Sequence, residues 1–130
     1  MKIEHVGYMV QDPIQVARWY CDHLGFTVAR EMQTTPFTHF LVDGSGRVMV
    51  EIYNNPAAQV PDYAAMDPLV LHLAFDTGDE AIEAVRDRLL AAGATLYSDL
   101  SVTPAGDQLI MLRDPWGMAV QLAKRKRPMI

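Results

Sequence analysis

The sequence has little cysteine, no long apolar run and no excess of basic residues. Its single cysteine, Cys21, excludes an intramolecular disulfide. No apolar run approaches the ~20 residues that a bilayer-spanning helix needs, and the first residues lack the apolar core of a secretory signal. The net charge of −5 argues against a general nucleic-acid-binding protein. We therefore expect a cytoplasmic protein with neither a membrane nor a nucleic acid as its partner.

The chain has the size and the composition of one folded domain. It has 130 residues, of which 50% are apolar, enough to build a hydrophobic core. The one basic cluster is Lys124-Arg125-Lys126-Arg127. Because it follows the last expected strand, we interpret residues 124–130 as a solvated tail.

Alternating and β-branched runs predict strands at residues 2–10, 26–30, 37–42, 48–53, 69–75, 94–97, 108–112 and 118–123. Two helices interrupt them. Asp12 is a suitable N-cap for the first, with Pro13 at the first helical position and Gly25 at its end. The second helix follows Thr77-Gly78-Asp79 and closes at Gly93. Residues 54–68 contain three prolines and lack periodicity, which is typical of a linker.

These elements form the order β-α-β-β-β twice. Three landmarks repeat at nearly one offset: His5 to His72 (72 − 5 = 67), Gly25 to Gly93 (93 − 25 = 68) and Glu51 to Gln121 (121 − 51 = 70). The sequence therefore predicts one α+β domain, 1–130, of two tandem βαβββ modules at 1–53 and 69–123. We expect them to form a curved, barrel-like mixed sheet with the helices on its outer face.

Each of four strand-like runs carries one side chain that can bind a metal. Glu51 lies in Val48-Met49-Val50-Glu51-Ile52-Tyr53, where a carboxylate in an apolar strand needs a partner. The other three are His5, His72 and Gln121. Side chains alternate across a strand, so the aliphatic neighbours of Glu51 and Gln121 face the helices, and these two face a concave surface. We predict that the four residues bind one divalent ion of Ni, Co, Mn, Fe or Zn.

Other residues are weaker candidates. Met49, Tyr53, Asn54, Met111 and Trp116 are predicted to shape a substrate pocket, although packing in the core or in a turn also explains them. Gln121 can bind a metal or hydrogen-bond a neighbour instead. His39 could line the pocket, but we expect it at the surface or at the edge of the barrel.

The combination of motifs resembles the vicinal oxygen chelate superfamily, which includes glyoxalase I, methylmalonyl-CoA epimerase, extradiol dioxygenases and the fosfomycin and bleomycin resistance proteins. The resemblance covers nearly the whole chain. It rests on His5-Val6-Gly7, Trp19-Tyr20 with His23-Leu24-Gly25-Phe26, Val50-Glu51-Ile52-Tyr53-Asn54, Leu71-His72-Leu73-Ala74-Phe75, and Asp114-Pro115-Trp116-Gly117 before Gln121. It implies paired βαβββ modules, a metal in the concave face and a homodimer.

The ligand pattern resembles that of bacterial glyoxalase I, with one departure. His5, Glu51 and His72 match the first three ligand positions, whereas glyoxalase I has a glutamate at the position of Gln121. That glutamate also moves a proton in the family's isomerases, and an amide cannot do so. The extradiol dioxygenases also take their carboxylate from this last position, and in methylmalonyl-CoA epimerase the glutamine and the glutamate are exchanged.

The resemblance implies a metal-dependent, glyoxalase-like lyase or isomerase. Its substrate would be a small molecule chelated through two vicinal oxygens, reacting through enediolate-type chemistry. Glu51 is the predicted catalytic residue, because it is the only carboxylate among the four. The alternative is a non-catalytic protein of the same superfamily that binds or sequesters a small molecule.

Overall fold

The computed structural model describes residues 1–129, which form two compact units: unit 1, Met1–Pro61, and unit 2, from Asp62 onward. Each unit holds one mixed, four-stranded sheet and one helix. This confirms the predicted α+β class and the two tandem βαβββ modules. Each unit has its own open sheet with two edge strands, so neither sheet closes into a barrel.

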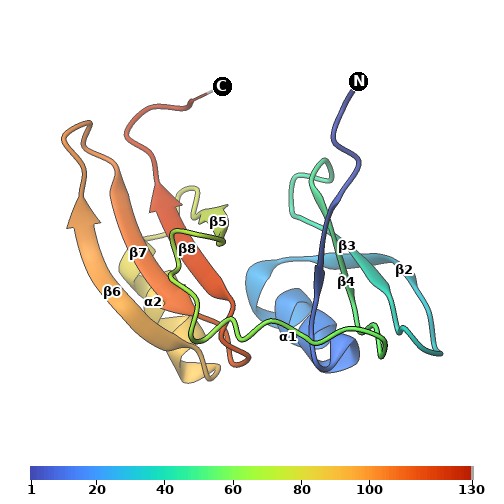
Figure 1. The fold of residues 1–130 in the computed structure, drawn as a ribbon. Helices are drawn as coiled ribbons and strands as arrows, with labels where there is room; N and C mark the ends of the chain where they lie inside the picture. The colour runs from blue at the N-terminus through green and yellow to red at the C-terminus, as the bar shows by residue number, and fades with distance from the viewer. Residues whose placement is uncertain (130) are drawn as a thin grey trace. The chain divides into compact units, whose positions relative to one another are not determined.

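The sheet of unit 1 has the strand order β1-β4-β3-β2, with β1 parallel to β4 and the other pairs antiparallel. The helix α1 packs against β2, β3 and β4, so it covers one face of this sheet (Figure 1). The elements in chain order are β1 (Val6–Met9), α1 (Pro13–Leu24), β2 (Thr27–Glu31), β3 (His39–Val42) and β4 (Met49–Tyr53).

The ends of α1 are set by the residues that the sequence indicates. The Asp12 carboxylate accepts the backbone N–H of Gln15 at 3.0 Å, and Pro13 begins the helix. Gly25 follows at φ 75°, a conformation that favours glycine. The buried face of α1 includes Val16 and Tyr20, which are fully buried.

The sheet of unit 2 repeats this arrangement in the order β5-β8-β7-β6, with α2 packed against β6, β7 and β8 (Figure 1). The elements are β5 (Leu73–Asp76), α2 (Ile82–Ala91), β6 (Thr95–Val102), β7 (Gln108–Arg113) and β8 (Ala119–Lys124). Gly93, at φ 96°, follows α2 as expected. Neither α1 nor α2, the helices in the described part of the chain, could cross a membrane.

The strand registers confirm the duplication. In unit 1, Gly7 of β1 pairs with Glu51 of β4; in unit 2, Ala74 of β5 pairs with Gln121 of β8. The offsets are 67 (74 − 7) and 70 (121 − 51), the same as those found in the sequence. The two units therefore place Glu51 and Gln121 at equivalent points of equivalent strands.

Two strands begin later than predicted. β1 starts at Val6 rather than residue 2, because its only partner β4 begins at Met49, and Ile3 is 82% exposed. β5 starts at Leu73 rather than residue 69. The carboxylate of Asp67 accepts the N–H of Leu69, and this turn replaces the first residues of the expected strand. His5 and His72 therefore lie just before their strands, not at the centres.

The strand predicted at residues 94–97 is longer than expected. β6 extends from Thr95 to Val102 as an edge strand paired with β7. All its residues are exposed and several are polar, so the alternation that marks a half-buried strand is absent.

The first residues of unit 2 are fixed to its sheet by Arg113. The guanidinium of Arg113 donates to the carbonyls of Tyr63 and Met66, each at 2.7 Å, and to that of Gly117 at 2.9 Å. The segment before β5 is therefore an ordered part of unit 2, although it contains neither helix nor strand.

Candidate metal and substrate site

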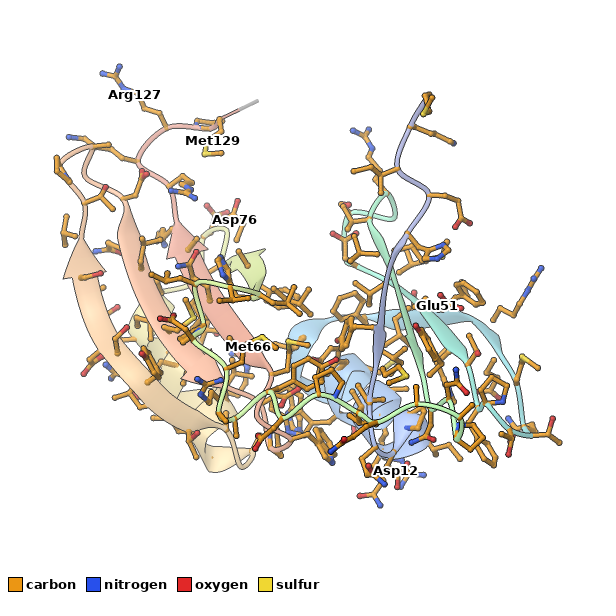
Figure 2. All side chains as sticks on the ribbon, viewed as in Figure 1. Asp12, Glu51, Met66, Asp76, Arg127 and Met129 are labelled. Atoms are coloured by element: carbon orange, nitrogen blue, oxygen red, sulfur yellow. The ribbon has the colours of Figure 1, made fainter. Side chains whose placement is uncertain are left out.

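Glu51 and His5 meet on one face of the unit 1 sheet. Glu51 lies at the middle of β4, between the buried Val50 and Ile52 (Figure 2). Those two neighbours point into the core on the α1 side, so the Glu51 side chain points to the other face. There the Oε2 atom of Glu51 lies 3.2 Å from Nε2 of His5. The carboxylate therefore has a histidine partner and is also 23% exposed.

Gly7 provides the space for this contact. It is the register partner of Glu51, and the Glu51 side chain folds across it. A Cβ atom at position 7 would lie only 2.9 Å from Oε2 of Glu51. A residue with a side chain at this position would displace the carboxylate.

The other nitrogen of the His5 ring is held by Glu4. Nδ1 of His5 donates to the Glu4 carboxylate in a short contact. This hydrogen bond raises the pKa of His5 above its ordinary value; loss of hydration opposes the increase, and the charges of Glu4 and Glu51 add to it. The contact also fixes the ring with Nε2 toward Glu51.

His72 and Gln121 occupy the equivalent positions in unit 2. Gln121 is half-buried at the middle of β8, between the buried Val120 and Leu122. His72 lies two residues before Ala74, as His5 lies two before Gly7. Its Nδ1 donates to the carbonyl of Pro68 at 2.9 Å, so Nε2 of the neutral ring carries the lone pair.

The structure therefore brings together His5 and Glu51, and it places His72 and Gln121 at matching registers in the second unit. Within residues 1–129, no group of three or more His, Cys, Asp or Glu side chains is arranged to hold a metal ion. The binding of one metal by all four residues stays a prediction.

The two histidines nevertheless have a property that suits metal ligands. Both use Nδ1 to donate to an acceptor, a carboxylate for His5 and a carbonyl for His72. A metal-binding histidine normally makes such a hydrogen bond, which fixes the tautomer and leaves the other nitrogen to the metal. The donor set of Nε2 atoms with carboxylate and amide oxygens fits a divalent ion.

A hollow lies next to Glu51. Its volume is about 430 Å³, and Glu51 is its only charged lining residue. The others present hydroxyl, amide and apolar groups: Thr35, Pro36, Thr38, Tyr53, Asn55 and Pro56. This composition suits a small molecule that is held by hydrogen bonds beside one carboxylate.

Among the predicted pocket residues, Tyr53 lines this hollow and Met49 is half-buried at the start of β4. The amide of Asn54 donates to the carbonyls of Val10 and Gln11, at 3.1 and 3.0 Å, and so ties β4 to the end of β1. In unit 2, Met111 is buried in β7, and the backbone N–H of Trp116 donates to Asp114. Their roles toward a substrate stay predictions.

Sequence reasoning missed Thr38 and Phe40. Thr38 lines the hollow, and the Phe40 ring meets the His5 ring edge to face at a centroid distance of 5.6 Å. Thr38 and Phe40 are two residues apart in the strand predicted at 37–42, so alternation places both side chains on one face. That spacing was the sequence signal that could have identified them.

The surface or edge position expected for His39 is wrong. β3 is an internal strand, and alternation turns His39 toward α1, where it is 4% exposed. Its Nδ1 donates to the carbonyl of Phe37 at 2.7 Å.

Comparison with known proteins identifies the class to which this fold and these residues belong. The sequence model of the Glyoxalase/Bleomycin resistance protein/Dioxygenase superfamily matches residues 2–122. The chain is therefore a member of that superfamily. A search of curated proteins returned no match.

Solved structures share the fold over nearly the whole chain. The protein SMU.1112c is 26% identical, with a TM-score of 0.72, covering 95% of this chain and 98% of its own. A glyoxalase family protein from Bacillus cereus is 15% identical, with a TM-score of 0.80 and coverages of 95% and 93%. The genomically encoded fosfomycin resistance protein FosX from Listeria monocytogenes is 14% identical, with a TM-score of 0.71 and coverages of 100% and 95%.

Proposed function

We propose that this protein is a metal-dependent, glyoxalase-like enzyme, a lyase or isomerase that acts on a small substrate with two vicinal oxygens. The observation that carries the proposal is the contact between Nε2 of His5 and Oε2 of Glu51, 3.2 Å apart over Gly7. A nitrogen and a carboxylate oxygen converge there beside a hollow of about 430 Å³. Membership of the superfamily is consistent with this function.

The residues that would hold the metal are His5, Glu51, His72 and Gln121, two imidazoles with a carboxylate and an amide. Ni²⁺, Co²⁺, Mn²⁺, Fe²⁺ and Zn²⁺ all accept such a donor set. When bound, the metal supplies Lewis acidity, which stabilises negative charge on a substrate oxygen.

Glu51 is the residue that moves a proton in this proposal. Its carboxylate borders the hollow and is partly exposed, so it can accept a proton from a substrate carbon and return it. Gln121 cannot exchange a proton. We therefore favour transfer from one side of the substrate, or a metal-assisted addition, over an epimerisation that needs two bases.

Metal content is the first test. Protein purified without a histidine tag should be stripped, offered each of the five ions and measured by elemental analysis. We expect about one ion per chain, because the two anchored imidazoles and the carboxylate are available as donors. Less than about half an ion per chain with every metal contradicts the enzyme proposal. The loaded protein should then be assayed for hemithioacetal isomerisation, thiol addition to epoxides and 2-acyl epimerisation.

Glu51→Gln separates proton transfer from metal binding. The amide keeps an oxygen for the metal but cannot accept a proton, so kcat should fall by at least about 100-fold. Metal content should fall less. Glu83→Gln on α2 makes the same chemical change away from the hollow and serves as the control. Full turnover in metal-loaded Glu51→Gln protein removes Glu51 from the mechanism.

The alternative is a binding protein without turnover. One observation favours it: the hollow of about 430 Å³ beside Glu51 is otherwise lined by hydroxyl, amide and apolar groups, which can hold a small molecule by themselves. Such a protein would bind a small molecule equally well before and after treatment with a chelator. Metal content and chelator sensitivity therefore distinguish the two functions.

We also propose a homodimer, the assembly that the family resemblance implies. Light scattering during gel filtration should give about twice the 14.5 kDa mass of the chain. A monomeric mass across the accessible concentrations contradicts this part of the proposal.

A further inference from the structure

One row of side chains crosses the whole sheet of unit 1 on the face of Glu51. The register pairs Gly7 with Glu51, Glu51 with Phe40, and Phe40 with Arg30. Side chains of directly paired residues point to the same side of a sheet. Arg30 therefore belongs to the face that carries Glu51, with Phe40 between the two charges.

A β-bulge gives Arg30 this position. The pairs Thr27 with Val42 and Val28 with Leu41 are followed by Arg30 with Phe40, so Ala29 is the extra residue. Without the extra residue, Arg30 would pair with His39, whose side chain is buried on the α1 side. A bulge re-aims the residues that follow it, and here it turns Arg30 toward the open face.

Unit 2 has the same bulge but not the same charge. Its register shifts between Leu96 and Ser98, and Ser98 then pairs with Met111, which pairs with Gln121. The bulge is thus a feature of both units, whereas the charged row occurs only in unit 1. The fold explains why a side chain is presented at this position, but it does not require an arginine there.

The Arg30 side chain is not engaged by another side chain or a carbonyl of the described residues. No hydrogen bond or ion pair to its side chain is found within residues 1–129, and it is exposed. The side chains of the exposed Arg18 and Arg47 are unpaired as well in this part of the chain, whereas Arg86, Arg88 and Arg113 are paired. What distinguishes Arg30 is its place in the row of Glu51. The Arg30 guanidinium is therefore available to an incoming ligand.

The spacing of the row sets the distance between the two charges. Adjacent strands lie ~4.8 Å apart, so the backbone of Arg30, two strands away, is about 10 Å from that of Glu51. Thr38 lies directly before β3, two residues from Phe40, the partner of Arg30, so it is about 7–8 Å from Arg30; Thr38 also lines the hollow beside Glu51. A guanidinium on this side chain can reach the border of that hollow.

We propose that Arg30 determines specificity by binding an oxyanion group of the substrate, a carboxylate or a phosphonate, while the reacting end of the same molecule lies at Glu51. This inference rests on the proposed function and adds its substrate class, a small organic acid. A guanidinium matches both oxyanions with two parallel N–H donors. The negative Glu51 disfavours the reverse orientation, and Phe40 contacts the apolar part between the two ends.

The test uses metal-free protein, so that it does not depend on the metal. Phenylphosphonate and benzoate are the probes, and benzamide is their uncharged counterpart. Binding is followed by NMR at the Arg30 Nε–H and the Phe40 ring. We expect both anions to shift these resonances and benzamide to leave the Arg30 signal unchanged. The anion that binds with the higher affinity identifies the class of oxyanion.

Variants show whether Arg30 is responsible. In Arg30→Gln, affinity for the tighter anion should fall by at least about tenfold, and Arg30→Lys should restore part of it. Arg47→Gln, which removes an exposed arginine from the loop before β4, should change affinity less than twofold, or about 0.4 kcal/mol. Equal binding by Arg30→Gln and wild type, or equal binding of benzamide and the anions, overturns the inference. The metal measurement is separate, so its failure would contradict the proposed function alone.

Discussion

At the scale of single residues, the surroundings of Glu51 explain how a carboxylate is tolerated in an apolar strand. Val50 and Ile52 on either side are 3% and 0% exposed, yet Glu51 points to the other face. It meets the His5 imidazole there and keeps contact with water. Its charge is thus neither fully buried nor left without a partner.

Gly7→Ala should separate the two candidate ligands in unit 1. The new Cβ would lie 2.9 Å from Oε2 of Glu51, the end of a flexible side chain, so the carboxylate moves rather than the backbone. We expect a loss of stability below about 1 kcal/mol but a decrease in metal affinity of about tenfold. Calorimetric metal titration and chemical denaturation measure the two effects.

Gly44→Ala is the control for this substitution. A Cβ at position 44 has only the carbonyl oxygen of Gly25 nearby, at 4.0 Å, so neither stability nor metal affinity should change appreciably. Unchanged metal affinity in Gly7→Ala would show that the position of the Glu51 carboxylate does not matter for binding.

Sequence alone predicted which residues face away from the helices, but not all of their neighbours. Glu51 and Gln121 occupy the expected face, because alternation within a regular strand is reliable. The face of Arg30 was not predictable in this way. Its orientation depends on a bulge, and one extra residue exchanges the two faces of a strand.

At the scale of elements, the turn between β3 and β4 depends on one carboxylate. Oδ1 of Asp43 accepts the N–H of Ser45 at 3.1 Å, its hydroxyl at 2.7 Å, and the N–H of Val48 at 3.3 Å. Loss of hydration raises the pKa of Asp43, but these hydrogen bonds outweigh it and hold the pKa below its ordinary value. The charged form therefore stabilises the turn that leads into the Glu51 strand.

Asp43→Asn should reduce stability in a pH-dependent way. The folded state lowers the pKa of Asp43, so its contribution is present above the unfolded-state pKa and is lost as pH falls through the folded-state value. At pH 7 we expect a loss of about 1 kcal/mol, and at about pH 2–3 the variant and wild type should converge. Urea denaturation across this range measures the difference, and a pH-independent gap contradicts the assignment.

Element types were more predictable than element ends. Both predicted helices and all eight predicted strands are present in residues 1–129, because periodicity and glycine stops mark most of them. The starts of β1 and β5 were predicted too early. Ile3 and Leu69 are apolar and suit a strand, but they are 82% and 77% exposed. Neither has a paired residue on a neighbouring strand, so neither belongs to the sheet.

At the scale of the whole molecule, two units with one fold carry different chemistry. The equivalent rows are Gly7-Glu51-Phe40-Arg30 in unit 1 and Ala74-Gln121-Met111-Ser98 in unit 2. The first row contains both charges, and the second contains none. The scaffold thus occurs twice, and only the copy in unit 1 carries ionisable groups in this row.

Gln121→Glu would give the second row a carboxylate. Replacing a neutral oxygen donor with a charged one should strengthen divalent metal binding by about tenfold if Gln121 is a ligand. Gln108→Glu makes the same change on β7, another strand of that sheet, and should have little effect. Isothermal titration with the preferred metal compares the variants. Equal affinities would exclude Gln121 from the ligand set.

The contacts of Arg113 also indicate where a fragment that contains unit 2 should begin. A fragment cut at residue 69, where the periodic sequence begins, would lack Tyr63 and Met66, two of the three carbonyl partners of Arg113. A fragment cut at Asp62 keeps all three. A chimera that exchanges unit 2 with another protein should therefore place its junction before Asp62. With that junction, unit 2 keeps its own three acceptors for the Arg113 guanidinium.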